Sequence, residues 1–168
     1  IPSNVKTLKS SGVYSNEYGV FENCTKLRKV TIGDENEQVA PTTIGKDAFR
    51  NCTALETLYI GNGVETIGES AFNGCTELSS VTIAGNVTSI GYGAFKACSS
   101  LTSVELPATV TTISSNAFSG CSALQSIVIP DGVMEIGANS FVCCSSIKTG
   151  LSLKGIDLLE ICHRQRDA

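Results

Sequence analysis

The stretch AFNGCTELSSVTI, residues 71–83, contains the pattern that decides the fold. Its pair of a phenylalanine followed three residues later by a cysteine returns every 23 residues along most of the chain. Phenylalanine occupies positions 49, 72, 95, 118 and 141, and cysteine occupies 52, 75, 98, 121 and 144. A fixed period of this length is typical of a repeat architecture, in which each unit buries its apolar face against the next.

The hydrophobic spacing changes within one unit. Residues 71–78 place apolar side chains at i, i+1, i+4 and i+7, which is typical of one face of a short helical turn. Residues 78–83 then read LxxVxI, and their last positions alternate apolar and polar as a strand does. Turn residues follow, as in Pro130-Asp131-Gly132. A glycine such as Gly91 closes most units, where we expect it to relieve backbone strain in a turn.

These units predict an α/β solenoid with one parallel β-sheet face and short helical or 3-10 returns. We expect residues 1–19 to form an irregular N-terminal cap or partial repeat. Residues 20–148 would be the solenoid of about five to six repeats, and residues 149–168 a C-terminal cap or tail. The spacing from Cys24 to Cys52 is 28 residues rather than 23, and the excess falls near the acidic stretch 33–38.

The repeat also resembles a known family. The LxxVxI strand followed by a short return looks like a leucine-rich repeat. The segment IGESAFNGCTEL, residues 67–78, is similar in particular to the BspA type, with its pattern IGxxAFxxCxxL. The resemblance covers roughly residues 20–148. It implies a right-handed, gently curved solenoid that exposes its parallel sheet, and a role in binding or adhesion at a cell surface.

Composition restricts the classes of function. The net charge of −4 argues against a general binder of nucleic acid or anionic membranes, and no apolar run is long enough to insert into a membrane. Because the chain opens on Ile1, we expect it to be a processed form or part of a longer chain or assembly.

The regular cysteines are predicted to be buried free thiols that fill the gap beside each phenylalanine. The chain contains no CxxC motif, the cysteine spacing typical of zinc sites. In-register stacking points neighbouring cysteines in the same direction, which is a poor geometry for disulfides. Metal binding and disulfides therefore stay weaker alternatives. Cys143 and Cys162 lie off the period and are the candidates for a disulfide or a reactive thiol. The predicted thiol ladder comprises Cys24, Cys52, Cys75, Cys98, Cys121 and Cys144.

Nothing in the sequence predicts an enzyme. His163 is the only histidine, and although it follows Cys162, sequence neighbours seldom face one another and no orienting acid stands at a recognisable spacing. The 16 glycines fall mainly at repeat turns and form no phosphate-binding motif. We therefore expect no catalytic residues, no cofactor and no metal.

The outward positions of the strands are the best place for a partner. Binding hot spots favour Trp, Tyr and Arg, and of these the outward strand positions offer only Tyr59. The candidate binding face comprises Lys29, Thr31, Tyr59, Thr82 and Glu105. The alternative is a plain β-surface filled with strand-favouring threonine.

Three sequons offer candidate glycosylation sites at Asn23, Asn51 and Asn86, although a Ser- and Thr-rich repeat also produces such triplets by chance. Asn86 is the best acceptor because it lies in a predicted turn.

Two functional hypotheses follow. The first is a non-catalytic recognition or adhesion module that binds another protein or a surface glycan, located outside the cell or on its surface. The second is a structural scaffold or assembly subunit with no dedicated small ligand, which would also suit an intracellular location.

Overall fold

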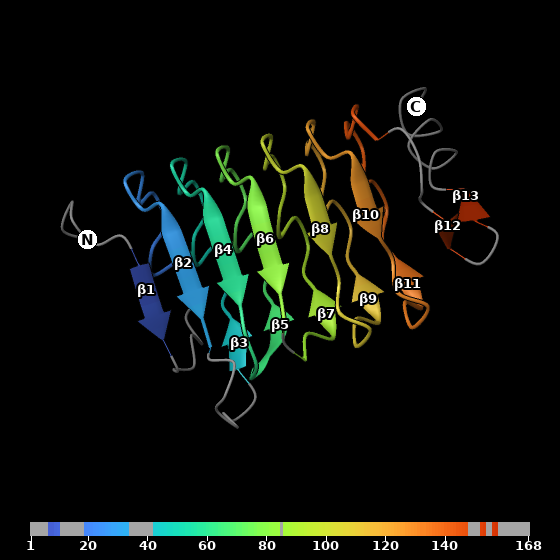
Figure 1. Cartoon of the computed structure of the whole chain (residues 1–168), viewed down its shortest axis with the longest axis horizontal. Helices are drawn as coiled ribbons and strands as arrows, with labels where there is room; N and C mark the ends of the chain where they lie inside the picture. The colour runs from blue at the N-terminus through green and yellow to red at the C-terminus, as the bar shows by residue number, and fades with distance from the viewer. Residues whose placement is uncertain are drawn as a thin grey trace.

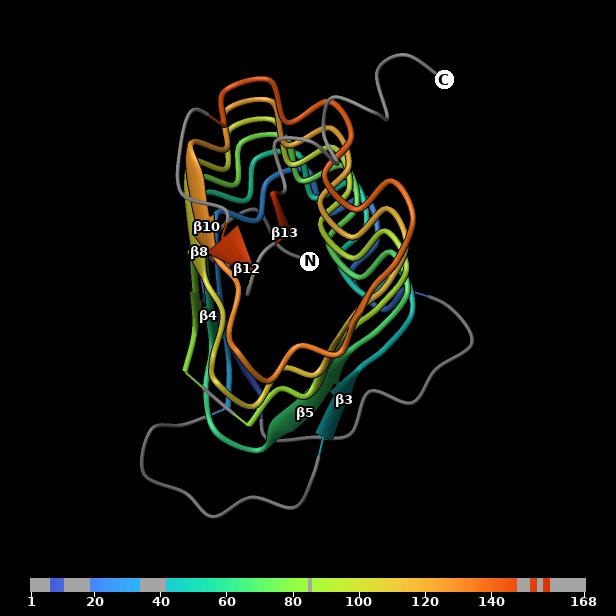
Figure 2. The same cartoon turned by 90° about the vertical axis from the view of Figure 1, so that its right-hand side faces the viewer.

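The structure is a computed structural model that describes residues 7–10, 19–33, 42–84, 86–147, 152–153 and 156–157. Its described part is a stack of similar coils, and successive coils place their strands side by side (Figure 1). The predicted solenoid is therefore confirmed. Viewed from one end, the coils superpose around a common interior, with the larger sheet forming one wall (Figure 2).

The larger sheet has six parallel strands in the order β1-β2-β4-β6-β8-β10. Their buried positions stay in register, since Val30 pairs with Leu58, Leu58 with Val81, and Val81 with Val104. Burial alternates along β2, β4, β6, β8 and β10 because side chains project to opposite faces of a sheet. The strands are β1 (Thr7–Ser10), β2 (Lys29–Ile32), β4 (Thr57–Ile60), β6 (Ser80–Ile83), β8 (Ser103–Glu105) and β10 (Ser126–Val128).

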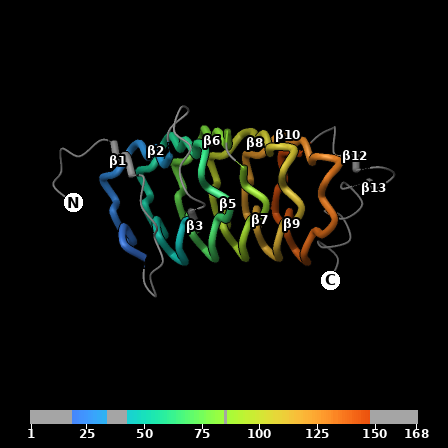
Figure 3. Tube along the Cα trace, turned by 90° about the horizontal axis from the view of Figure 1, so that it is seen from below, coloured from blue at the N-terminus to red at the C-terminus, as the bar shows by residue number. Residues whose placement is uncertain are grey.

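A second parallel sheet runs along the stack, in the order β11-β9-β7-β5-β3, where we expected only one (Figure 3). Most of its strands are two residues long, which is too short for an alternating pattern to reveal them. They are β3 (Thr42–Ile44), β5 (Val64–Ile67), β7 (Ser89–Ile90), β9 (Thr112–Ile113) and β11 (Glu135–Ile136). Within the expected C-terminal cap or tail, β12 (Ser152–Leu153) and β13 (Ile156–Asp157) pair antiparallel.

The returns consist of consecutive turns, which corrects the expectation of helical or 3-10 segments. The amide of Cys52 donates to the carbonyl of Phe49 in its own coil, whereas the amide of Phe49 donates to Ala71 in the next coil. Asn51, with φ of 56°, lies in the left-handed region, so the backbone cannot continue as a helix there. The described residues include no helix that is long and apolar enough to cross a bilayer.

The interior is built from apolar rows that run along the stack. Phenylalanine rings of neighbouring coils stack with centroids 5.1 to 5.6 Å apart, from Phe21 through Phe141. Each buried side chain of this kind stabilises the fold by about 1.5–3 kcal/mol. Among the described residues, only Ser119 and Ser140 are buried polar side chains. The core therefore offers few groups for chemistry.

The glycine that closes a coil is needed for close contact between coils, not for a strained turn. Gly68 and Gly91 have no positive φ. A Cβ built on Gly68 would lie 2.5 Å from the carbonyl oxygen of Ile44 in the preceding coil. The expectation of turn strain at this position was wrong, and its cause is the small separation of stacked backbones.

Candidate functional site

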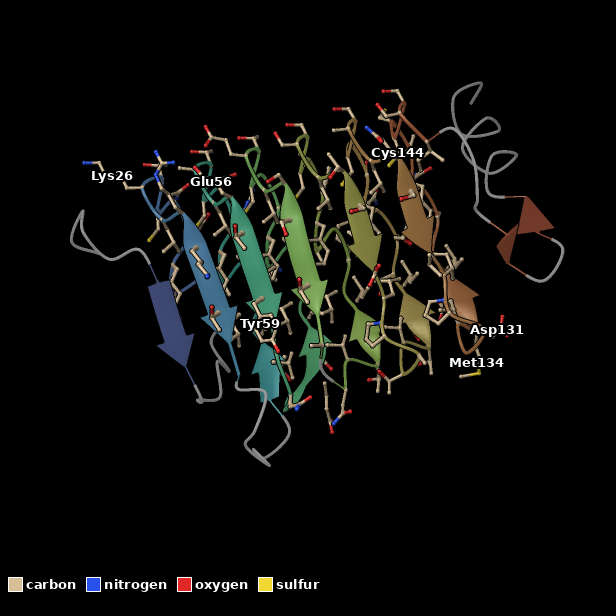
Figure 4. The ribbon with its side chains drawn as sticks, viewed as in Figure 1. Lys26, Glu56, Tyr59, Asp131, Met134 and Cys144 are labelled. Atoms are coloured by element: carbon tan, nitrogen blue, oxygen red, sulfur yellow. The ribbon has the colours of Figure 1, made fainter. Side chains whose placement is uncertain are left out.

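The outward face of the six-stranded sheet is the candidate site. From β2 to β10 it presents ten side chains, two per strand, while the residues between them point into the core. Figure 4 shows the side chain of Tyr59 on β4 within this surface. One row comprises Lys29, Thr57, Ser80, Ser103 and Ser126, and the other comprises Thr31, Tyr59, Thr82, Glu105 and Val128.

The structure brings the five predicted face residues together. Thr31 pairs with Tyr59, Tyr59 with Thr82, and Thr82 with Glu105, so four of the five form one continuous row. Lys29 stands in the adjacent row on β2. Lys29, Thr82 and Glu105 are exposed, and Thr31 and Tyr59 are half-buried.

An ion pair that sequence reasoning missed borders this face. The guanidinium of Arg28, next to Lys29, donates to the carboxylate of Glu56, which precedes β4. Both side chains are about half exposed, at 61% and 45%. Such surface pairs contribute at most about 1 kcal/mol, so its main effect is to neutralise Arg28 as a contact for an acidic ligand.

The ladder cysteines form one internal row whose thiols also act as donors. Five of the six are buried and Cys24 is half-buried. Each of those five donates from Sγ to the phenylalanine carbonyl of the preceding coil, as Cys98 does to Phe72 at 3.3 Å and Cys121 to Phe95 at 3.2 Å. Hydrophobic spacing alone does not reveal this bond, because a thiol counts there as a small apolar group.

Burial makes these thiols unreactive. Desolvation raises the pKa of Cys52 to about 12 and raises the pKa of Cys98 well above its ordinary value of 9.0. Because the thiolate is the reactive form, such thiols are poor nucleophiles and poor metal ligands at neutral pH. Six cysteines of the described part are free thiols: Cys24, Cys52, Cys75, Cys98, Cys121 and Cys143. No group of three or more metal-ligating side chains occurs among the described residues.

Only one of the two cysteines outside the ladder, Cys143, lies within the described residues. Cys143 is exposed and free, with a left-handed φ of 61°. Cys162 and its neighbour His163 lie outside the described residues.

The predicted acceptor asparagines have distinct environments. Asn86 is exposed. The amide nitrogen of Asn51 donates to the side-chain oxygen of Asn23 at 3.2 Å, and both residues have left-handed backbones. Because the amide nitrogen is the atom to be modified, Asn51 is the less suitable acceptor and Asn86 stays the best prediction.

The fold and this open sheet surface define a class of protein: a leucine-rich repeat solenoid. A family model described as the BspA type leucine rich repeat region matches residues 42–157 in six copies. The chain therefore belongs to the BspA-type leucine-rich repeat family, as its motif indicated.

Solved structures of bacterial proteins share the fold. A leucine-rich repeat protein from Bacteroides ovatus is 30% identical, with a TM-score of 0.72 over 86% of this chain and 36% of that one. One from Eubacterium ventriosum is 28% identical, with a TM-score of 0.68 over 94% of this chain and 38% of that one. This chain thus spans less than two fifths of either protein.

A leucine rich cell surface protein from Faecalibacterium prausnitzii is 26% identical, with a TM-score of 0.57 over 86% of this chain and 42% of that one. No curated protein matches the chain.

Proposed function

We propose that the chain is a non-catalytic recognition module that binds another protein or a surface glycan through the outward face of its six-stranded sheet. The observation that carries this proposal is the continuous row of Thr31, Tyr59, Thr82 and Glu105, held in register by parallel pairing. A rigid sheet presents such side chains at fixed spacing, so little conformational entropy is lost when a partner binds.

The distribution of polar groups supports binding over catalysis. In the described residues the polar and charged side chains are almost all at the surface, and the core is apolar. An active site normally converges several polar groups in a concave pocket. The outward face instead spreads its groups over five strands, which suits recognition of an extended partner.

A location at the cell surface is part of this proposal. The protein from F. prausnitzii with the same fold is described as a cell surface protein. The exposed Asn86 would carry a glycan if the chain passes through a eukaryotic secretory route.

A panel of immobilised surface glycans and secreted proteins tests the proposal, with binding of the purified chain measured by biolayer interferometry. We expect Tyr59→Ala to weaken the interaction at least tenfold, because aromatic anchors dominate binding surfaces. Tyr92→Ala is the matched control, since Tyr92 is 50% exposed but lies in a return, away from the sheet. Binding that Tyr59→Ala leaves unchanged would contradict the proposed face.

A scaffold or assembly subunit is the second candidate. It is favoured by the other outward row, where Thr57, Ser80, Ser103 and Ser126 offer no large anchor. Absence of binding across the panel, together with concentration-dependent association in sedimentation velocity, would favour this candidate.

A further inference from the structure

We infer that the N-terminal half of the outward face binds an acidic glycan, a sugar chain bearing carboxylate or sulfate groups. Lys29 would contact the acidic group, and Tyr59 would support a sugar ring. The inference rests on the proposed recognition role and specifies its ligand.

The charge on this part of the face is not balanced within the described structure. Arg28, Lys46 and Arg50 each pair with a carboxylate of a neighbouring residue. Lys29 is exposed and makes no ion pair with any residue that the structure describes.

Glu56, which precedes the strand partner of Lys29, is paired with Arg28, and the only carboxylate among the ten outward side chains is distant from Lys29. Glu105 lies on β8, three strands from β2, which is about 14 Å at the usual strand spacing of about 4.8 Å. Coulombic attraction between exposed charges at that distance is largely screened at physiological salt. Lys29 is therefore available to an acidic ligand even though the chain as a whole is acidic.

The aromatic ring stands close to this lysine. Lys29 pairs with Thr57, and Tyr59 is two residues further along the same strand. Strand spacing and rise per residue place Lys29 and Tyr59 about 8 Å apart. A ring that packs on Tyr59 would thus bring an acidic group on an adjoining sugar to the ammonium group of Lys29.

Hydroxyl groups surround Tyr59 on the sheet. Thr31 and Thr82 are its partners in the two neighbouring strands, and Thr57 precedes it on the same face of β4. Hydroxyls both donate and accept hydrogen bonds, as sugar hydroxyls do. A protein interface would call for several aromatic or arginine anchors, whereas this face has a single aromatic residue and six serines or threonines. These are Thr31, Thr57, Ser80, Thr82, Ser103 and Ser126. The composition favours a glycan.

The test measures binding of the purified chain to immobilised heparin, polygalacturonate and neutral dextran, at low and high sodium chloride. We expect binding to at least one acidic polymer and not to dextran, with weaker affinity at high salt because screening reduces the lysine contact. Lys29→Gln should weaken binding at least fivefold and Tyr59→Ala at least tenfold. Lys96→Gln is the matched control, because Lys96 is an exposed lysine of a return.

The outcomes separate this inference from the proposed function. Equal binding to acidic and neutral polymers, or no effect of Lys29→Gln, would overturn the acidic-glycan inference. If a neutral glycan or a protein binds and Tyr59→Ala abolishes that binding, the acidic ligand is wrong while the face stands. If no ligand binds in a Tyr59-dependent way, both proposals fail.

Discussion

Cys98→Ala is the substitution that tests the packing of the coils most sharply. Cys98 lies in a central coil and is fully buried, and its Sγ donates to the carbonyl of Phe72 at 3.3 Å. Alanine keeps the backbone and the Cβ but removes the sulfur. The change therefore leaves a void beside the phenylalanine stack and deletes one contact between coils.

The expected loss follows from these two effects. Removing one buried group the size of a methylene costs about 0.8 kcal/mol in transfer free energy, and the cavity adds to that cost because the core relaxes only in part. The hydrogen bond adds about 0.5 kcal/mol, since a thiol is a weak donor. The Phe72 carbonyl also accepts from the amide of Cys75, so it keeps a partner. Together we expect a loss of about 1.5–2.5 kcal/mol.

Urea unfolding, monitored by circular dichroism, measures this loss in the free energy of unfolding. The matched control is Cys143→Ala, because Cys143 is exposed and free, and we expect it to change stability by less than about 0.5 kcal/mol. A loss below 0.5 kcal/mol for Cys98→Ala would contradict the packing role of the ladder. So would a large loss of wild-type stability on adding reductant, which would show that disulfides hold the coils.

Three further substitutions or conditions test other parts of the structure. Gly68→Ala should destabilise the chain by about 1–3 kcal/mol, because its Cβ would lie 2.5 Å from the Ile44 carbonyl oxygen; urea unfolding with an unchanged free energy would refute the close approach of the coils. Ala97→Gly should stabilise it by about 0.5 kcal/mol, since φ of 60° at Ala97 costs about 1–2 kcal/mol and glycine entropy offsets about half of that; a lower melting temperature would contradict this. The free energy of unfolding should stay level up to about pH 9 and fall above it, because burial holds the pKa of Cys98 well above the 9.0 of an exposed thiol and the unfolded chain loses its proton first. The fall amounts to about 1.4 kcal/mol per pH unit for each buried thiol, and a pH titration in which Cys98→Ala shows the same slope as wild type would argue against it.

The 23-residue period of the sequence predicted the structural features that arise from burying the same positions in every coil. The apolar rows of the core, the strands of the larger sheet and the register of Tyr59 with Thr82 all follow from the 23-residue spacing, because stacked units place equivalent residues side by side. The predicted face residues lie on neighbouring strands in the structure for the same reason.

Features that depend on the backbone path were not predicted. The apolar spacing of a return fits a helical turn, but asparagine or glycine two residues after the phenylalanine adopts a left-handed conformation, as in Asn51 and Gly74. That repeated Asn or Gly was the available signal for a non-helical return. The bonds from Sγ to carbonyl oxygen and the Arg28–Glu56 pair depend on side-chain positions in two coils. Spacing along one chain does not encode them.

Alkylation of the native protein, followed by intact mass spectrometry and peptide mapping, tests the stacked-coil account most directly. We predict that Cys143 reacts at once, whereas the buried thiols Cys52, Cys75, Cys98 and Cys121 react only after unfolding and need no reductant. Rapid labelling of these four thiols in the native chain, or labelling that requires reduction, would contradict a buried row of free thiols between stacked coils.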